Sequence, residues 1–277
     1  KGKLNFAKKY AQRSMALAKE SAKKFYIAFS LTSLAAIYTY QGKINKCIPL
    51  FEESLAIFRE LNNKRMIAIT LNNAGEKYRM RGELDRALAY LEESAAIIQE
   101  LDNLRDVCHI YDFLIQILIE KGNFEQARDY LGKLKQLKSK LKNKEINQIY
   151  LFLNALLLKK SLRIRDQAKA EEILNHLLEE KPNFYELRTN ILINLCELYV
   201  HELKVLNNED ILNDINLVID NLLAFAKKSK SYWILSETYL LQAKVCLITF
   251  KIKQARNFLI QAQEIAENYD LKQCFSI

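Results

Sequence analysis

The sequence contains few residues that bend or break a chain: 6 glycines and 2 prolines among 277 residues. Folds built mainly from β-strands need many more such residues in their turns, so this scarcity indicates long helices with short connections. Apolar runs such as NALLL (154–158) are also short, well below the roughly 20 residues of a membrane-spanning helix. No basic start followed by an apolar core and a small-residue cleavage site is present, so we expect no secretory signal.

The 5 cysteines are scattered, and no two of them lie within four residues of each other. This excludes the spacings of common zinc and redox motifs. An odd number of cysteines without disulfide-like spacing is typical of a reducing compartment, so we expect a cytoplasmic protein. Most of the cysteines are interpreted as small buried apolar residues.

The formal net charge is +9, with the excess near the N-terminus. The most basic segment, KLKQLKSKLKNK (133–144), is expected to lie on one helix. There its lysines fall on both sides of a stripe formed by Leu134, Leu137 and Leu141. Such lysines cover an apolar seam with their aliphatic stems and do not form one face along a phosphate backbone. Nucleic-acid binding is therefore not expected.

One phrase occurs twice at an interval of forty residues: QGKINKCIPLFEESLAIF (41–58) and RGELDRALAYLEESAAII (81–98). Gly42, Gly82 and Gly122 mark three copies of this interval. A small residue follows each glycine after five positions, and a large residue follows after nine. A glycine between two amphipathic stretches is typical of the end of one helix and the start of the next. Each period therefore predicts a helix, a tight turn and a second helix.

The pattern continues in weaker form to both ends of the chain and predicts about thirteen helices in a single array over 1–277. Pro49 falls inside a predicted second helix. Proline is tolerated in the first turn, where amides lack helical partners, so this helix should begin near Asn45. The expected units are a half repeat at 1–20 and helix pairs at 22–62, 63–102, 103–142, 143–182, 183–230 and 231–270.

These residues resemble the tetratricopeptide repeat (TPR) family in its forty-residue form, as in kinesin light chains and bacterial peptide-sensing regulators. The family's small residues appear here as Gly75, Ala87 and Ser94, and its first-helix tyrosine appears as Tyr38, Tyr78 and Tyr199. The resemblance implies an all-α, right-handed superhelical solenoid of stacked antiparallel helix pairs. It also implies a non-catalytic scaffold for protein–protein interactions, with the first helix of each pair lining a concave groove.

The second unit offers a candidate binding face on its first helix. One side carries Asn72, Asn73, Glu76 and Arg79, together with Ile69 and Met80, whereas the opposite side is apolar. In the resembled relatives, asparagines in a matching Leu-Asn-Asn phrase clamp a peptide, and LNNAG (71–75) fits that phrase. The alternative, that these asparagines only cap neighbouring contacts, stays open. The residues expected to bind a peptide or partner domain are Thr32, Tyr40, Asn72, Asn73, Glu76, Arg79, Asp112 and Gln116.

A second candidate is YLFLNALLLKK (150–160), which is apolar nearly all round. Such a helix is buried on most sides. Either neighbouring helices cover it, or it forms an open groove for an acidic and apolar segment. In the open case, Phe152, Leu153 and Leu156 would be anchors, with Lys159 and Lys160 at the rim.

No catalytic constellation is visible in the sequence. Glu197 and His201 are spaced i, i+4 but lack a third metal ligand in the sequence. The paired carboxylates at 52–53 and 92–93 are expected to be solvated on the outer face. We therefore expect no enzyme activity, no metal and no cofactor.

The leading functional hypothesis is a peptide-binding scaffold. The alternative hypothesis is a regulatory arm of a larger signalling enzyme or transcription regulator, because the chain begins with Lys1 and with a half repeat. The exposed half repeat also suggests self-association.

Overall fold

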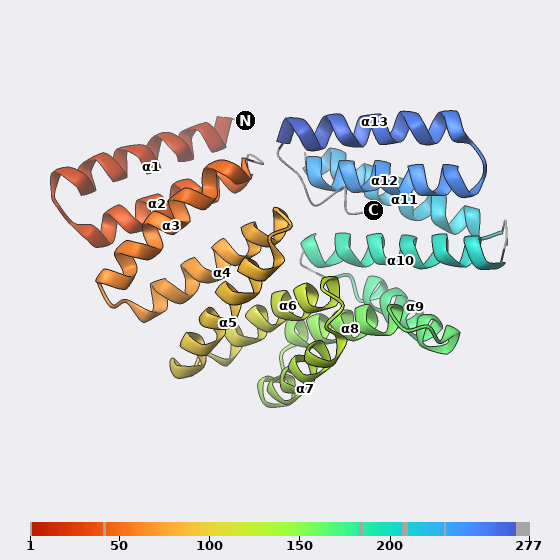
Figure 1. The fold of residues 1–277 in the computed structure, drawn as a ribbon, viewed down its shortest axis with the longest axis horizontal. Helices are drawn as coiled ribbons and strands as arrows, with labels where there is room; N and C mark the ends of the chain where they lie inside the picture. Colours follow the sequence, from red (N-terminus) through yellow and green to blue (C-terminus); the bar gives the residue numbers. More distant parts are fainter. Residues whose placement is uncertain (1, 41–42, 183–184, 207–209, 230, 270–277) are drawn as a thin grey trace. The chain divides into compact units, whose positions relative to one another are not determined.

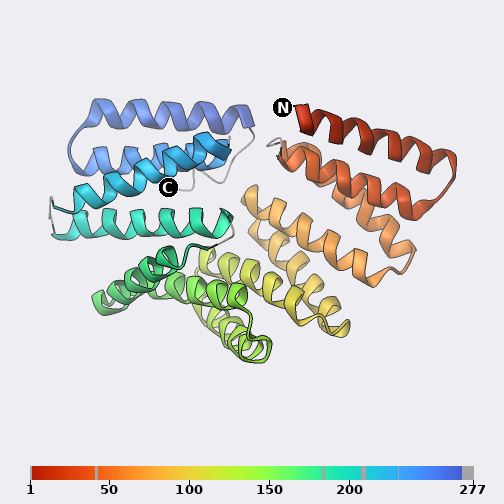
Figure 2. The ribbon, with the colours of Figure 1, turned by 180° about the vertical axis from the view of Figure 1, so that it is seen from behind.

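The computed structural model describes residues 2–40, 43–182, 185–206, 210–229 and 231–269. Within these ranges the chain forms thirteen α-helices and no strand, as the sequence predicts. The even-numbered helices α2 to α12 are called first helices below, and the odd-numbered helices are called second helices (Figures 1 and 2). The helices are α1 (Gly2–Glu20), α2 (Lys24–Tyr40), α3 (Ile44–Glu60), α4 (Lys64–Met80), α5 (Leu84–Glu100), α6 (Leu104–Glu120), α7 (Phe124–Leu141), α8 (Lys144–Lys159), α9 (Ile164–Glu179), α10 (Tyr185–Leu206), α11 (Ile211–Ser229), α12 (Tyr232–Ile248) and α13 (Ile252–Tyr269).

Three-residue turns join the helices from α3 to α7, and left-handed residues stop each helix. Gly82 and Gly122 have φ of 75° and 77°, as expected for a glycine that follows a helix end. The amide of the next residue then bonds back to the last turn, for example from Glu83 to the Tyr78 carbonyl at 2.9 Å. Asn62 and Asp102, in the turns between α3 and α4 and between α5 and α6, also have a positive φ, of 49° and 52°. No glycine marks these two turns, although the unit boundaries expected after residues 62 and 102 fall at them.

Asparagines cap three first helices at an interval of forty residues. The side chains of Asn63, Asn103 and Asn143 accept hydrogen bonds from backbone amides three residues later, at 3.1, 3.3 and 3.2 Å. Each cap satisfies an amide that has no partner within the helix and is worth about 1 kcal/mol. The caps thus fix where α4, α6 and α8 begin.

The predicted start of α3 near Asn45 is confirmed to within one residue, but Pro49 does not lie in the first turn. Helix α3 begins at Ile44, one residue before the expected start, so Pro49 is its sixth residue and lies beyond the first turn. The missing proline amide leaves the Asn45 carbonyl without its helical donor. Because Asn45 is exposed, water can hydrate that carbonyl.

The prediction that 133–144 lies on one helix is wrong. Helix α7 ends at Leu141, Lys142 has a φ of 45°, and α8 begins at Lys144. Two of the lysines lie over tyrosine rings. Lys133 Nζ is 4.7 Å from the centroid of the Tyr130 ring, and Lys138 Nζ is 4.5 Å from that of Tyr150. The sequence reasoning missed these aromatic partners.

The described chain divides near residue 123 into two compact units. Helices α1–α6 belong to the first unit, and α7–α13 belong to the second. Each unit is described by itself below. The single array over 1–277 and its repeat boundaries therefore stay predictions.

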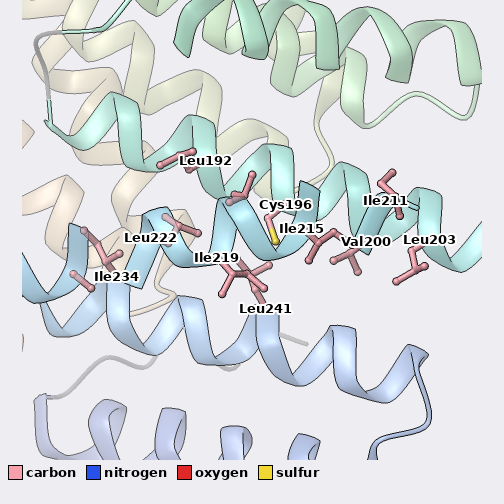
Figure 3. Packing of buried hydrophobic residues seen from close by; sticks show 12 residues of the cluster. Leu192, Cys196, Val200, Leu203, Ile211, Ile215, Ile219, Leu222, Ile234 and Leu241 are labelled. Carbon is pink, nitrogen blue, oxygen red and sulfur yellow. The ribbon is translucent and has the colours of Figure 1, made fainter. Parts of the chain in front are cut away.

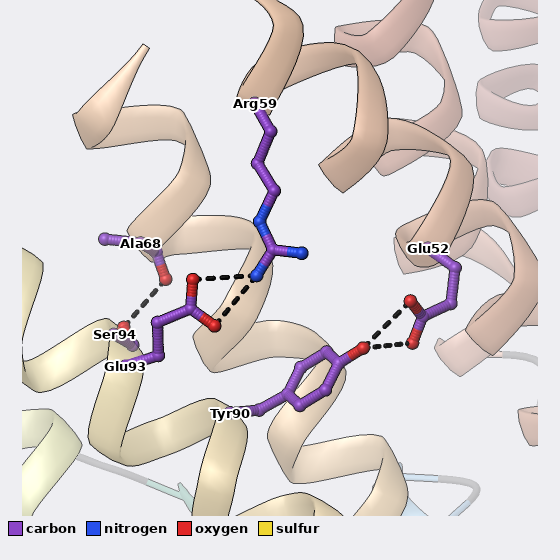
Figure 4. Close-up of polar contacts among 6 residues, drawn as sticks. All are labelled: Glu52, Arg59, Ala68, Tyr90, Glu93 and Ser94. Atoms are coloured by element: carbon purple, nitrogen blue, oxygen red, sulfur yellow. Dashed lines mark hydrogen bonds and ion pairs between the residues drawn. The ribbon is translucent and has the colours of Figure 1, made fainter. Parts of the chain in front are cut away.

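In the first unit, small residues and buried serines bring paired helices close together. Gly75 of α4 faces α5, where a Cβ added to it would lie 3.0 Å from Leu91 Cγ. Ser94 Oγ donates to the Ala68 carbonyl at 2.8 Å (Figure 4). Ser54 donates to the Ala28 carbonyl at the same distance one repeat earlier. The repeated serine thus joins α3 to α2 and α5 to α4.

Polar contacts also join consecutive second helices. Tyr90 of α5 donates to both carboxylate oxygens of Glu52 on α3, at 2.7 and 2.9 Å (Figure 4). Tyr78 donates to the same carboxylate at 2.6 Å. Arg59 of α3 donates to both oxygens of Glu93 on α5, at 2.7 and 2.8 Å. The expectation that Glu52 is a solvated outer-face residue is therefore wrong, because two tyrosines of the next pair bind it.

In the second unit, an apolar cluster joins α10, α11 and α12 (Figure 3). It includes the fully buried Cys196, Ile215 and Leu222. Cys47, Cys108, Cys196 and Cys246 are all buried free thiols, as predicted, whereas Cys274 lies outside the described residues. Burial raises the pKa of Cys108 to about 11 and that of Cys196 to about 12. These thiols therefore stay protonated and apolar at neutral pH.

The close contact at Gly75 predicts opposite effects for two glycine-to-alanine substitutions. Gly75→Ala should lower the free energy of unfolding by about 1–2 kcal/mol, because the new methyl group overpacks against Leu91. A Cβ added at Gly132 in α7 would meet no atom within 4 Å. Gly132→Ala should therefore raise the free energy of unfolding by up to about 1 kcal/mol, because alanine favours the helix more than glycine does. Urea denaturation followed by circular dichroism measures both. Stabilisation by Gly75→Ala would contradict the close approach.

The Glu52 site predicts a pH dependence of stability. Burial and the Glu52 carboxylate raise the pKa of Tyr78 to about 12 and also raise that of Tyr90. The folded state therefore holds these protons more tightly than the unfolded state, and this stabilisation is lost as pH rises above 10, the ordinary tyrosine pKa. Tyr90→Phe should cost about 1.5–3 kcal/mol at neutral pH.

The cost of Tyr90→Phe should shrink at about pH 11.5, because tyrosine in the unfolded state is then ionised. Urea denaturation at the two pH values tests this. Tyr26→Phe at an exposed position is the control, with an expected change of less than about 0.5 kcal/mol. An equal cost of Tyr90→Phe at both pH values would rule out the hydrogen bond to Glu52.

Candidate functional site

The candidate face on α4 has the predicted orientation. Asn72, Asn73, Glu76 and Arg79 are half-buried. Ile67, Leu71, Ala74 and Tyr78 on the opposite side are buried. The helical period therefore separates a polar side from the core side as expected.

The amides on this face have unused hydrogen-bonding capacity. Asn72 Oδ1 is buried and accepts no hydrogen bond from the described residues. The side chain of Asn73 makes no hydrogen bond to any described residue. An amide offers two donors and two acceptor positions, so Asn73 can serve a guest molecule without losing a partner of its own.

The charged residues of the face are paired within the chain. Arg79 Nε donates to Glu120 of α6 at 2.9 Å. Glu76 forms an ion pair at 2.8 Å with Lys77, whose side chain is 6% exposed. The sequence reasoning named neither Glu120 nor Lys77. Lys77 was missed because it occupies a core position, where Ile117 stands one repeat later.

Four other predicted residues lie on the neighbouring first helices α2 and α6. Gln116 Nε2 donates to Asp112 at 2.6 Å, so α6 brings these two side chains together. Thr32 instead lies against α3, where its hydroxyl is 2.7 Å from Ser54 Oγ. The structure therefore places Thr32 in the contact between paired helices. Tyr40 ends α2, and its side chain lies outside the described residues.

The second unit contains a related arrangement that the sequence reasoning missed. The phrase NLCELY (194–199) of α10 repeats the pattern of NAGEKY (73–78), with Asn, a small residue, Glu and Tyr at matching places. Lys159 at the end of α8 donates to Asn194 Oδ1 and Glu197 Oε2, both at 2.5 Å. The ammonium nitrogen of Lys244 on α12 lies 3.9 Å from Glu197 Oε1. The shared phrase could have revealed this site.

Burial and charge act together at this network. Burial lowers the pKa of Lys159, and the Glu197 carboxylate opposes that shift. Burial acts to raise the pKa of Glu197, but the Lys159 ammonium group holds it below its ordinary value. This contact between opposite charges joins α8 to α10.

The apolar segment of α8 is covered. Phe152 and Leu153 are buried at 2% and 0% exposure. The covered alternative is therefore confirmed for these two residues, and the open groove that would use them as anchors is wrong. Lys159 does not stand at a solvent rim, because it is bound to α10.

None of the described helices has the length and apolar character needed to cross a lipid bilayer. Among the described residues, no three His, Cys, Asp or Glu side chains are placed to hold a metal ion. Glu197, which forms the i, i+4 pair with His201 in the sequence, is bound by Lys159.

A family model described as the MalT-like TPR region matches residues 1–270. No curated protein sequence matches the chain significantly. Among solved structures, the aspartyl phosphate phosphatase F from Bacillus subtilis matches with a TM-score of 0.63 and 17% identity. That match covers 78% of this chain and 55% of the phosphatase, so the chain spans about half of that protein.

The Rap conjugation gene regulator of the plasmid pLS20, solved in complex with the Phr* peptide, matches with a TM-score of 0.66 and 14% identity. That match covers 99% of this chain and 71% of the regulator. At these identities, the two likenesses establish the fold alone.

The Lys159 network predicts unequal effects for its two partners. Glu197→Gln should lower the free energy of unfolding by about 2–4 kcal/mol, because it leaves a buried ammonium group unpaired. Lys159→Met should cost about 1 kcal/mol or less, because Glu197 is 38% exposed and keeps Lys244 nearby. Urea denaturation of both variants measures the difference. A larger cost for Lys159→Met would show that Lys159 is not the buried partner.

Proposed function

The chain belongs to the MalT-like TPR region family, and we propose that the first-helix face of its first unit binds an extended peptide of a partner protein without catalysis. The binding residues are centred on Asn72, Asn73 and Glu76 of α4. The half-buried Asp112 of α6 extends the polar surface on the next first helix, where the buried Gln116 donates a hydrogen bond to it.

One comparison between the two units carries this proposal. Asn194 accepts a hydrogen bond from Lys159, the sixteenth residue of α8. The sixteenth residue of α2 is Thr39, whose hydroxyl donates to the Ala35 carbonyl. Asn73 occupies the place of Asn194 in the shared phrase. Because the sixteenth residue of α2 is not a lysine, no lysine at this position donates a hydrogen bond to Asn73. A peptide backbone supplies the missing donors and acceptors.

The related regulator of pLS20 was solved with a bound peptide, and this likeness supports the proposal. The ion pair between Arg79 and Glu120 restrains both side chains at the border of the surface that Asn72 and Asn73 form. An extended peptide suits this surface, because its unpaired backbone groups can bond to side-chain amides while its own side chains contact the half-buried Ile69 and Met80.

The test is a binding measurement on a peptide selected against this chain from a random display library. The double variant Asn72→Ala/Asn73→Ala should weaken the selected peptide about 10–30-fold, because two hydrogen bonds of about 1 kcal/mol each are lost. Fluorescence anisotropy measures the dissociation constant.

The matched control is Asn213→Ala/Asn257→Ala, which removes two exposed amides from the second helices α11 and α13. It should bind the peptide as the unmodified chain does. Equal binding by the Asn72/Asn73 variant, with an unchanged melting curve, would refute the proposed site. Arg79 is kept in this test, because its substitution would also break the contact with Glu120.

A second candidate function is a regulatory arm within a longer signalling protein or transcription regulator. It is favoured by the family model and by matches that cover 55% of a phosphatase and 71% of a gene regulator. The complete reading frame tests this function. A catalytic or DNA-binding domain in the same frame would support it, and a frame without either would count against it.

A further inference from the structure

Phe250, in the turn between α12 and α13, occupies the turn position at which Gly82 and Gly122 stand. Its φ is 56°, against 75° and 77° for the two glycines. The Lys251 amide then bonds back to the Cys246 carbonyl at 2.8 Å, the same backbone contact that follows Gly82. A bulky side chain rarely adopts this left-handed backbone, so the turn by itself favours glycine.

Packing within the chain does not explain this phenylalanine, because its side chain is 87% exposed. A Cβ added to Gly82 or Gly122 would likewise meet no atom within 4 Å, although described helices precede and follow both of these turns. The position is therefore open in turns inside the array as well. Its opening at Phe250 is a property of the turn.

The turn between α8 and α9 also carries exposed apolar side chains. Helix α5 begins at Leu84, three residues before the buried Ala87, whereas α9 begins at Ile164, six residues before the buried Ala170. The additional residues extend α9 beyond the length that the repeat requires. Leu162 is 100% exposed and Ile164 is 76% exposed, so the extension presents two large apolar side chains to solvent.

Hydrogen bonds hold this second turn in shape. Ser161 Oγ donates to Asp166 Oδ2 at 2.6 Å, and Gln167 Nε2 donates to the Ser161 carbonyl at 3.0 Å. The exposed Leu162 and Ile164 lie between these bonded residues in the sequence. The turn therefore presents them without a loss of order on binding.

The two turns lie at the same edge of the second unit (Figures 1 and 2). Each follows a first helix, and the first helices α8, α10 and α12 run in the same direction (Figure 1). Residues 160–166 and 247–256 are called the turn edge below.

The turn edge is strongly basic. It contains six lysine and arginine side chains and one carboxylate, Asp166. In the first unit, the turn at 81–83 reads Arg-Gly-Glu, and its two charges pair with each other. On the turn edge, four exposed cations form no ion pair with any described residue: Arg163, Arg165, Lys251 and Lys253.

This arrangement favours a lipid surface over a protein surface. Leu162 and Phe250 protrude from two separate turns, with the α10–α11 connection between them in the chain, so a protein would need two pockets at a matching distance. A bilayer accepts protruding apolar side chains at any spacing, and its anionic headgroups attract lysine and arginine. Such a contact requires no helix that spans the membrane.

We propose that the turn edge binds the surface of a membrane that contains anionic lipids. Leu162, Ile164 and Phe250 enter the interfacial layer, and the four unpaired cations contact lipid phosphates. The turn edge belongs to the second unit, so this site is separate from the proposed peptide face on α4 and α6.

The probes are vesicles of phosphatidylcholine alone and vesicles in which about 30% of the lipid is phosphatidylglycerol. The full chain should bind the anionic vesicles at least about tenfold more tightly at about 0.05 M salt, and this binding should weaken as salt rises to about 0.5 M. Co-sedimentation with a series of lipid concentrations measures both affinities.

Phe250→Gly separates binding from folding. It should weaken binding to the anionic vesicles at least about fivefold, because an apolar contact with the interface is lost. The melting temperature should not fall, because glycine adopts a positive φ readily. The control Leu101→Ser removes a turn leucine of the first unit that is 41% exposed and should bind as the unmodified chain does.

Arg163→Glu/Lys251→Glu tests the charge of the turn edge and should weaken binding to the anionic vesicles at least about tenfold. The control Lys135→Glu/Lys140→Glu changes the net charge equally at exposed positions of α7. It should weaken binding by less than about threefold, because screening limits the attraction of distant charges.

Fluorescence tests whether the turn enters the lipid. The emission of Phe250→Trp should shift to shorter wavelength when anionic vesicles are added, because the indole then leaves water. The unmodified chain, whose single tryptophan is the partly buried Trp233, should show no such shift.

Equal binding to the two kinds of vesicle would overturn the proposal, as would unchanged binding by Phe250→Gly or an equal loss in the α7 control. Binding to neither vesicle would also overturn it and would leave a protein as the occupant of the turn edge. A preference for anionic vesicles that is lost in Phe250→Gly and Arg163→Glu/Lys251→Glu, and kept in both controls, would support it.

Discussion

Contacts between neighbouring helix pairs are the interaction on which this structure depends. A pair of amphipathic helices has two apolar sides and can bury only one of them within itself. In the first unit, Phe58 of α3 and Leu71 of α4 share one cluster, although they belong to different pairs. Burying such a side chain contributes about 1.5–3 kcal/mol. Stability is therefore spread along the chain, and each pair supports the pair beside it.

Polar groups at repeated positions add specificity to this stacking. The carboxylate of Glu52 receives two tyrosine hydroxyls from the next pair, and Lys159 holds Asn194 and Glu197 of the next first helix. These contacts recur near the forty-residue period and favour one register of neighbouring helices. The same logic identifies an open place, because Asn73 occupies a register whose counterpart, Asn194, has a hydrogen-bond partner.

Much of the fold could be predicted from sequence, because helix period and turn residues are local properties. The spacing of Gly82 and Gly122 gave the turns, and the polar side of α4 was identified from the helical period. The turns at Asn62 and Asp102 have a left-handed backbone without a glycine, so only the forty-residue period indicated their places. Pairings such as Arg79 with Glu120 depend on how helices stack, so no single period reveals them.

The candidate site was less predictable than the fold for the same reason. A polar side chain on the expected face can bind a guest or a neighbouring helix, and only three-dimensional contacts separate the two. Thr32 proved to contact Ser54 on the paired helix, whereas Asn73 has no hydrogen-bond partner among the described residues. The comparison of Asn73 with Asn194 required the position of Lys159, which the sequence assigned a place only in the alternative of an open groove.

Hydrogen exchange in a Leu91→Ala variant tests most directly whether pairs depend on their neighbours. Leu91 is fully buried in α5 beside Gly75 of α4, so the substitution leaves a cavity at one place in the first unit. Mass spectrometry should show faster exchange in α3–α6, strongest around α5, with α10–α12 unchanged. Faster exchange confined to α5, or an equal increase along the whole chain, would contradict stabilisation by neighbouring pairs.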